Sequence, residues 1–149
     1  MKIHLISALA IAASCTNVFA QHHTETQEKP KIVSPLSFLS VRSEQLTDEE
    51  LKTFKMESSV MTVVPGGIDT VSHRHDCELF GYVLEGTIEV GLDKKTPVAY
   101  TVGQMFFEKR NILHSFTRNP SAERPAKVLL IFIIKDGRPG YTREYPNAR

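Results

Sequence analysis

The chain has 149 residues, a length typical of one domain, with 18 Lys and Arg residues against 17 Asp and Glu residues. A formal net charge of +1 argues against nucleic acid or an anionic membrane surface as the main partner. A domain of this size buries enough apolar surface to fold unaided.

Residues 1–20 have the pattern of a secretory signal peptide. Lys2 gives a positive start, "ISALAIAA" is an apolar core too short to span a bilayer, and "VFA" ends the segment like a cleavage site. A lipoprotein signal, with "AASC" anchoring the chain through Cys15, is the alternative. No later segment is apolar for long enough to cross a membrane. We therefore expect a secreted or periplasmic protein with a flexible leader at 21–33 and a folded domain at 34–149.

From about Val33 the sequence has the pattern of short strands separated by turn signals. Between the first two strands, "LTDEELKTF" predicts one or two helical turns, with Thr47 as N-cap and Glu50 three residues later. These elements predict an all-β sandwich or barrel with a short helical turn near its N-terminus. The strands are expected at 36–41, 58–64, 79–92 (a hairpin-like pair bent at Gly86), 97–102, 104–108, 112–119 and 126–134.

Two histidines stand out because His73 and His75 are separated by one residue on a predicted strand. Residues i and i+2 of a strand face the same side, so the two imidazoles can approach one ion. The pair alone is a weak signal, since two exposed histidines on a strand edge are more common than a pair of ligands.

The spacing around these histidines is more specific. Gly67, five residues, "HRH", ten residues and Gly86 together resemble the first motif of the cupin family. Gly103, followed eleven residues later by His114, resembles the second motif. The resemblance covers about residues 56–134. It implies a double-stranded β-helix, or jelly-roll barrel, in which both motifs bring their histidines to one inner wall.

The sequence departs from the family motifs at several positions. Leu79 stands where the first motif has a glutamate, and Glu78, one position earlier, would face away on a regular strand. Lys109, Asn111 and Arg118 stand where the second motif has Pro, Gly and Asn. Asn111 is the mildest change, because Asn tolerates the left-handed turn conformation that Gly would supply.

The resemblance therefore implies a three-histidine metal site formed by His73, His75 and His114. Three neutral imidazoles suit a divalent ion such as Fe, Zn, Ni, Mn or Cu and leave positions open for water and substrate. Some cupins with a histidine triad are iron dioxygenases. The alternative is a barrel without metal, whose histidines only form hydrogen bonds.

Three further residues are candidates to complete the site. Glu108 could be a fourth ligand or a general base, and the alternative is an exposed side chain paired with Lys109 or Arg110. Cys77, the one cysteine left after cleavage, is expected to be buried, and it reaches the site only if the turn after His75 swings its sulfur inward. Glu78 reaches the site only if the strand bulges there.

The rest of the inner wall is expected to be apolar, which predicts a small, largely apolar or aromatic ligand. We also expect a homodimer, because a second copy can cover an open sheet edge and an apolar outer face. Phe80, Tyr82 and Leu84 are the outward candidates for that contact. The inward candidates are Met61, Val63, Leu79, Gly81 and Val83, with either Met105 and Phe107 or Phe106 closing the cavity.

Three functions are compatible with this sequence. The first is a metal-dependent enzyme acting on a small molecule, as a dioxygenase, isomerase or decarboxylase. The second is a module that binds a small ligand or a metal without turnover. The third is a structural dimeric barrel with an empty pocket. The first two depend on the metal and the third does not.

Overall fold

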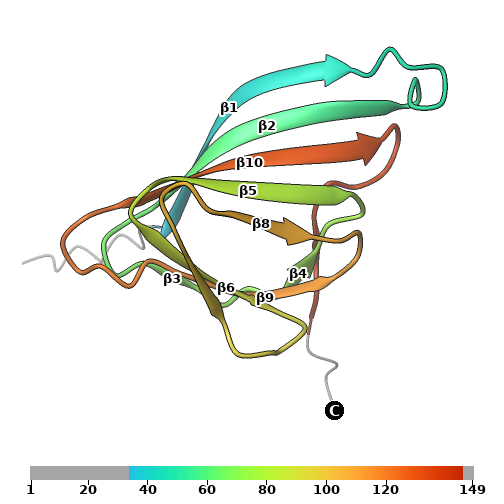
Figure 1. The fold of residues 1–149 in the computed structure, drawn as a ribbon. Coiled ribbons are helices and arrows are strands. Elements are labelled where there is room, and N and C mark those ends of the chain that lie inside the picture. Colours follow the sequence, from blue (N-terminus) through green and yellow to red (C-terminus); the bar gives the residue numbers. More distant parts are fainter. Residues whose placement is uncertain (1–33, 146–149) are drawn as a thin grey trace, which may run out of the picture. The chain divides into compact units, whose positions relative to one another are not determined.

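The computed structural model describes residues 34–145, which contain eleven strands. Along the longer strands, side chains alternate between the inner and the outer face of a sheet. The strands form two antiparallel sheets, which Figure 1 shows as two layers. The predicted signal peptide, the possible anchor at Cys15 and the leader lie outside the described residues.

The first sheet carries the long strands, and it is the upper layer in Figure 1. β1, β2, β10 and β5 pair along most of their lengths, and the short β8 pairs with β5. In spatial order the strands are β1 (Leu36–Gln45), β2 (Phe54–Val63), β10 (Ala126–Lys135), β5 (Glu78–Glu85) and β8 (Met105–Glu108).

The second sheet carries shorter strands, and it brings segments from both halves of the domain together. β3 pairs with one end of β9, and β4 pairs with the other end. In spatial order the strands are β11 (Thr142–Arg143), β4 (His73–Arg74), β9 (Leu113–Arg118), β6 (Thr87–Leu92) and β7 (Val98–Thr101), with β3 (Ile68–Asp69) beside β9.

The hydrophobic core lies between the inner faces of the two sheets. Its side chains come from alternate positions of the strands, as the expected period of two requires. Full burial of each large apolar side chain contributes about 1.5–3 kcal/mol relative to exposure. The largest fully buried apolar members are Leu79, Ile88, Val63, Val83 and Val128.

The inward and outward assignments of the sequence hold on β5. Leu79, Gly81 and Val83 are buried, and they alternate with Phe80, Tyr82 and Leu84 on the outer face. On β8, Phe106 rather than Met105 and Phe107 faces the core. A Cβ atom added at Gly81 would lie 2.1 Å from Phe106 Cζ, so the aromatic ring occupies the space that the glycine leaves.

The helical turn predicted near the N-terminus is wrong. The residues between β1 and β2 form turns instead, in which Leu51 N–H donates to Asp48 O and Phe54 N–H donates to Leu51 O. Asp48 Oδ1 accepts from Glu50 N–H, the bond expected from Thr47 as an N-cap. A loop this short between paired strands cannot repay the cost of helix nucleation. No helix in residues 34–145 is long and apolar enough to span a bilayer.

The hairpin predicted around Gly86 is also wrong. β5 and β6 belong to different sheets, so the chain crosses from one layer to the other at this glycine. Gly86 has a φ of 74°, and a Cβ atom there would lie 2.9 Å from Pro125 O. Period-two patterns before and after a glycine are the same for a hairpin and for a crossover, so the sequence alone does not separate them.

The outer face of the first sheet has one apolar row across its whole width, whereas flanking positions on the same face include Thr62 and Lys127. One cross-strand row contains an apolar side chain from each of the five strands, and β1 at the edge of the sheet is exposed along most of its length. Such a face favours contact with another molecule. The row consists of Leu39, Val60, Leu129, Tyr82 and Met105.

We propose that this face packs against a second copy of the chain, because the row carries no charge that self-association would bring against a like charge. Sedimentation velocity should give twice the monomer mass, and Tyr82→Glu, at a side chain that is 36% exposed, should give the monomer mass. Val98→Glu, at an exposed position on β7, is the matched control and should stay dimeric. A monomeric unsubstituted protein, or a dimer unaffected by Tyr82→Glu, would contradict this interface.

Candidate metal and ligand site

The pairing of β4 with β9 brings the two histidine motifs together. His73 is the cross-strand partner of His114, and their ring centroids are 4.7 Å apart. His75 follows directly after β4, and its ring centroid is 4.8 Å from that of His73. All three imidazoles are buried. The three residues singled out by the sequence spacing therefore form one cluster on the inner side of the domain.

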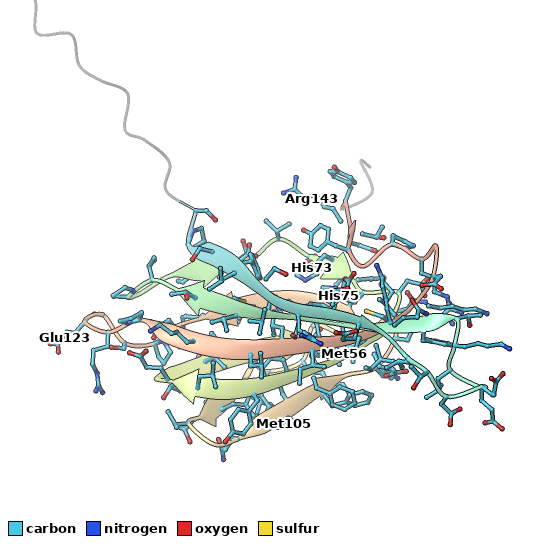
Figure 2. The ribbon with its side chains drawn as sticks, turned by 90° about the horizontal axis from the view of Figure 1, so that it is seen from above. Met56, His73, His75, Met105, Glu123 and Arg143 are labelled. Carbon is cyan, nitrogen blue, oxygen red and sulfur yellow. The ribbon has the colours of Figure 1, made fainter. Side chains whose placement is uncertain are left out.

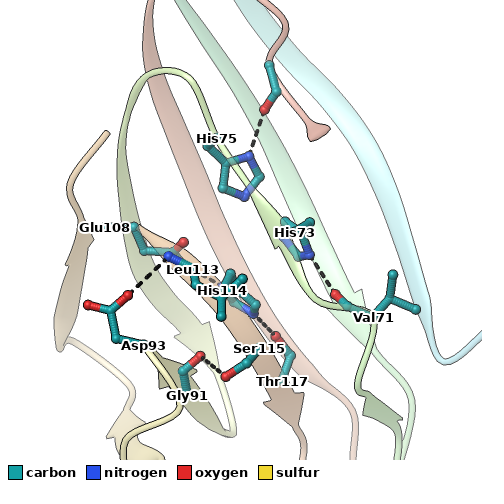
Figure 3. Close-up of polar contacts among 11 residues, drawn as sticks. Val71, His73, His75, Gly91, Asp93, Glu108, Leu113, His114, Ser115 and Thr117 are labelled. Atoms are coloured by element: carbon teal, nitrogen blue, oxygen red, sulfur yellow. Dashed lines mark hydrogen bonds and ion pairs between the residues drawn. The ribbon is translucent and has the colours of Figure 1, made fainter. Parts of the chain in front are cut away.

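Backbone carbonyls orient two of the three rings (Figure 3). His73 Nδ1–H donates to Val71 O at 2.8 Å, and His75 Nδ1–H donates to Gly140 O at 2.7 Å. A carbonyl can only accept, so both neutral rings carry their proton on Nδ1. The lone pair of each ring is then on Nε2, and each Nε2 is left without a hydrogen-bond partner among the described residues. Fixing the tautomer in this way is how metal-binding histidines are commonly prepared.

His114 differs because both of its ring nitrogens have side-chain partners. Its Nδ1–H donates to Glu108 Oε1 at 2.9 Å, and Thr117 Oγ1–H donates to Nε2 at 2.7 Å. The carboxylate fixes the proton on Nδ1, as the carbonyls do for the other two rings. The lone pair on Nε2 is occupied by the threonine hydroxyl.

Glu108 lies inside the site, with 2% of its surface exposed. Its cross-strand partner is Leu79, which also faces inward. Oε1 accepts the proton of His114, whereas Oε2 is buried with no hydrogen-bond partner among the described residues. The alternative of an exposed Glu108 paired with Lys109 or Arg110 is wrong, because the pleat of β8 turns this side chain toward the core.

Cys77 and Glu78 lie outside the cavity that the histidines line. Cys77 is buried, and burial raises the pKa of its thiol to about 11, so it is not a thiolate at neutral pH. Glu78 alternates with the inward Leu79 on β5, as a regular strand requires. Of the three residues considered as additions to the triad, the cavity contains Glu108 alone.

A cavity of about 490 Å³ opens from the histidine cluster. Besides the histidines, its polar lining residues are Ser34, Asp69, Glu108, Thr117 and Arg143, and its other walls are mainly apolar and aromatic. The volume and lining are those of a small-molecule site. The apolar and aromatic walls include Leu36, Phe38, Met61, Leu79, Val90, Phe106, Leu130 and Phe132.

Residues 140–145, here called the C-terminal strap, cover the histidine cluster. The ring of Tyr141 lies 4.6 Å from that of His73, centroid to centroid, and β11 pairs with β4. Arg74 anchors the strap from the outer side through two hydrogen bonds to the Glu144 carboxylate. No sequence pattern predicts the strap, because "KDGRPGY" only ends a strand pattern and β11 is two residues long.

A protein-family model described as "Cupin domain" matches residues 59–132. Together with the two-sheet jelly roll and its histidine wall, this match decides the family. The chain belongs to the cupin superfamily. No curated protein matches the sequence.

Several solved structures share the fold at low sequence identity. A double-stranded β-helix protein from Klebsiella pneumoniae is 14% identical, with a TM-score of 0.59 over 79% of this chain and 90% of that one. An RmlC-like cupin from Shewanella frigidimarina is 18% identical, with a TM-score of 0.52 over 79% and 95%. The DMSP lyase DddQ from Ruegeria pomeroyi is 21% identical, with a TM-score of 0.52, and this chain spans 45% of its length. These similarities establish the fold alone.

The cupin site has the donor set for a divalent ion, but its donors do not converge on one point. Among residues 34–145, no three His, Cys, Asp or Glu side chains are arranged so as to hold a metal. The rings of His73 and His114 are stacked at 18°, and Thr117 occupies Nε2 of His114. The donor chemistry and the unpartnered Glu108 Oε2 fit a cation. His114 must leave Thr117 to become a ligand.

The environment of His73 keeps its imidazole neutral. Burial lowers the pKa of His73 to about 4, the hydrogen bond to Val71 O opposes the shift, and the neighbouring His114 and His75 add to it. A neutral ring at pH 7 has a lone pair to offer a cation or a hydrogen-bond donor.

The cupin should therefore lose stability in acid when it is free of metal. The unfolded chain takes up a proton at His73 near pH 6.5, and the folded protein does so only near pH 4. The free energy of unfolding should fall by about 1–3 kcal/mol as the pH is lowered through this window, the lower values reflecting solvent screening of the ring. Urea unfolding of chelator-treated protein at several pH values measures the fall, and His73→Gln should flatten it. An equal fall in that variant would assign the acid sensitivity to other groups.

Proposed function

We propose that this cupin binds a divalent metal ion through His73, His75 and His114, at the buried end of a cavity that receives a small, largely apolar ligand. The proposal is supported by the hydrogen bonds from Nδ1 of His73 and His75 to backbone carbonyls. These bonds leave Nε2 of both rings without a partner among the described residues, next to the ring of His114. Two oriented lone pairs next to the imidazole of His114 provide most of what a site with three nitrogen ligands requires.

The hydrogen bond from Thr117 to His114 is a small obstacle to this proposal. Breaking one such bond costs about 0.5–1.5 kcal/mol, and the free threonine hydroxyl can bond to water or ligand in the cavity. Even a metal site much weaker than the structural zinc sites of zinc fingers, which contribute about 10–16 kcal/mol, would exceed this cost. A bound metal ion would therefore outweigh the hydrogen bond from Thr117 to His114.

Glu108 has two tasks in the proposed site, one for each carboxylate oxygen. Oε1 accepts from Nδ1–H of His114, which keeps the lone pair of that ring on Nε2. Oε2 is free and buried beside the cluster, where it can bind the ion or accept a proton from a bound ligand. The second task makes an enzyme the second candidate function, with Glu108 as general base.

The metal, when bound, would supply Lewis acidity and a coordination site for an oxygen atom of the ligand. The residues of the chain would do the rest. The apolar walls around Phe132 and Leu130 would hold the body of the ligand and exclude water, and Glu108 would hold or release a proton at Oε2. If the metal-loaded protein turns over a substrate, and Glu108→Gln abolishes that turnover while keeping the metal, the protein is an enzyme. Ligand binding without turnover indicates a binding module.

Metal analysis of protein purified without a polyhistidine tag tests the proposal. After loading, we expect one ion per chain, and His73→Ala, His75→Ala or His114→Ala should weaken binding by more than the 10–100-fold typical of outer-shell changes. Thr117→Val should not weaken binding, because it releases Nε2 of His114.

A double substitution of His22 and His23 by Ala controls for metal held by the leader, and it should leave the bound ion in place. Absence of metal after loading, or full occupancy in His114→Ala, would contradict the proposed site. In that case the histidines would only form the hydrogen bonds described above.

A further inference from the structure

We propose that Arg143 binds the anionic group of the ligand, so that the natural ligand is a small organic acid with an apolar body. This inference deepens the proposed function and rests on its statement that the cavity receives a ligand. It does not depend on the metal. Four observations carry it: the register of Arg143, its charge environment, the walls of the cavity and the spacing between strands.

The register places Arg143 in the same cross-strand row as the histidines. His114 on β9 pairs with His73 on β4, and His73 pairs with Arg143 on β11. Residues paired in this way present their side chains on the same face of a sheet. Arg143 therefore stands on the inner face, at the edge strand beside the cluster, and it lines the cavity. Figure 2 shows it at the same side of the domain as His73.

The charge of Arg143 is not neutralised within the described residues. Nearby arginines have carboxylate partners: Arg74 pairs with Glu144, and Arg110 pairs with Asp76. No ion pair among residues 34–145 involves Arg143, whose side-chain neighbours are Tyr141 and Tyr145; its guanidinium carbon lies 6.0 Å from the Tyr145 ring centroid. A guanidinium at the mouth of an apolar cavity is a fitting partner for a carboxylate, which it can bind through two parallel hydrogen bonds.

The cavity limits the size and character of this acid. The neighbouring strands β4 and β11 lie about 5 Å apart. One small molecule can therefore place its carboxylate at Arg143 and a second polar group at His73. The body of that molecule would lie against Phe38, Met61 and Phe132. Asp69 also lines the cavity, but its Oδ1 accepts from Val71 N–H at 2.9 Å. If the Asp69 carboxylate selected the ligand instead of Arg143, the cavity would bind an amine more tightly than an acid.

The test compares ligands that share a body and differ in charge. Isothermal titration or ligand-observed NMR would measure binding of phenylacetate, phenylacetamide and phenethylamine, and of hexanoate and hexanamide. The acids should bind about five- to ten-fold tighter than their amides. The preference should fall with added salt, since the guanidinium is exposed.

Arg143→Gln should bring the acids to parity with the amides while leaving binding of the amides and the metal content unchanged. Arg143→Lys should keep part of the preference, because it keeps the charge and loses the two-bond geometry. Arg124→Gln is the matched control, since it removes one positive charge at a site away from the cavity, and the preference should persist.

Equal binding of acids and amides, preference for the amine, or absence of binding by any acid would overturn the inference. These outcomes are distinct from failure of the proposed metal site. If the histidine variants lose the metal but the unsubstituted protein shows no carboxylate preference, the metal site is supported and the role of Arg143 is contradicted. A carboxylate preference in protein that binds no metal does the reverse.

Discussion

The short ladder between β4 and β9 is the constraint on which the site depends. It consists of two residue pairs, yet it joins a histidine from each motif and extends through β11 to Arg143. The long strands of the first sheet and the core beneath them hold the two partners in register. Burial of the core supplies the free energy that keeps β4 and β9 paired, and the pairing converts sequence spacing into a cluster of side chains.

Burial of three imidazoles and a carboxylate has a cost that the site offsets in part. Each ring donates to a backbone carbonyl or to Glu108, so no imidazole N–H is left unpaired. The remaining groups are the lone pairs of His73 and His75 and one oxygen of Glu108, all on the cavity side. In the proposed site, a cation would satisfy these acceptors once His114 has turned away from Thr117. The apolar walls around them lower the local dielectric and strengthen each interaction that a ligand forms there.

The sequence predicted what depends on spacing and alternation, and missed what depends on long-range contacts. The intervals that link His73, His75 and His114 identified the cluster, and Asn111 has the left-handed conformation expected of it, with a φ of 59°. The turn after Gly86 was misassigned because a hairpin and a crossover share one local pattern. Arg143 was missed because the strap is fixed by contacts with β4, and these leave no periodic pattern in a two-residue strand.

The central claim is the proposal that the histidine cluster binds a metal ion, with Glu108 orienting the His114 ring and Thr117 releasing its Nε2. The most direct measurement is a crystal structure of the cobalt-loaded protein with anomalous scattering recorded at the cobalt edge. We predict one strong peak within about 2.0–2.1 Å of Nε2 of His73, His75 and His114, with His114 turned away from Thr117. No peak at the cluster, with the hydrogen bond from Thr117 to His114 intact at saturating cobalt, would contradict the claim.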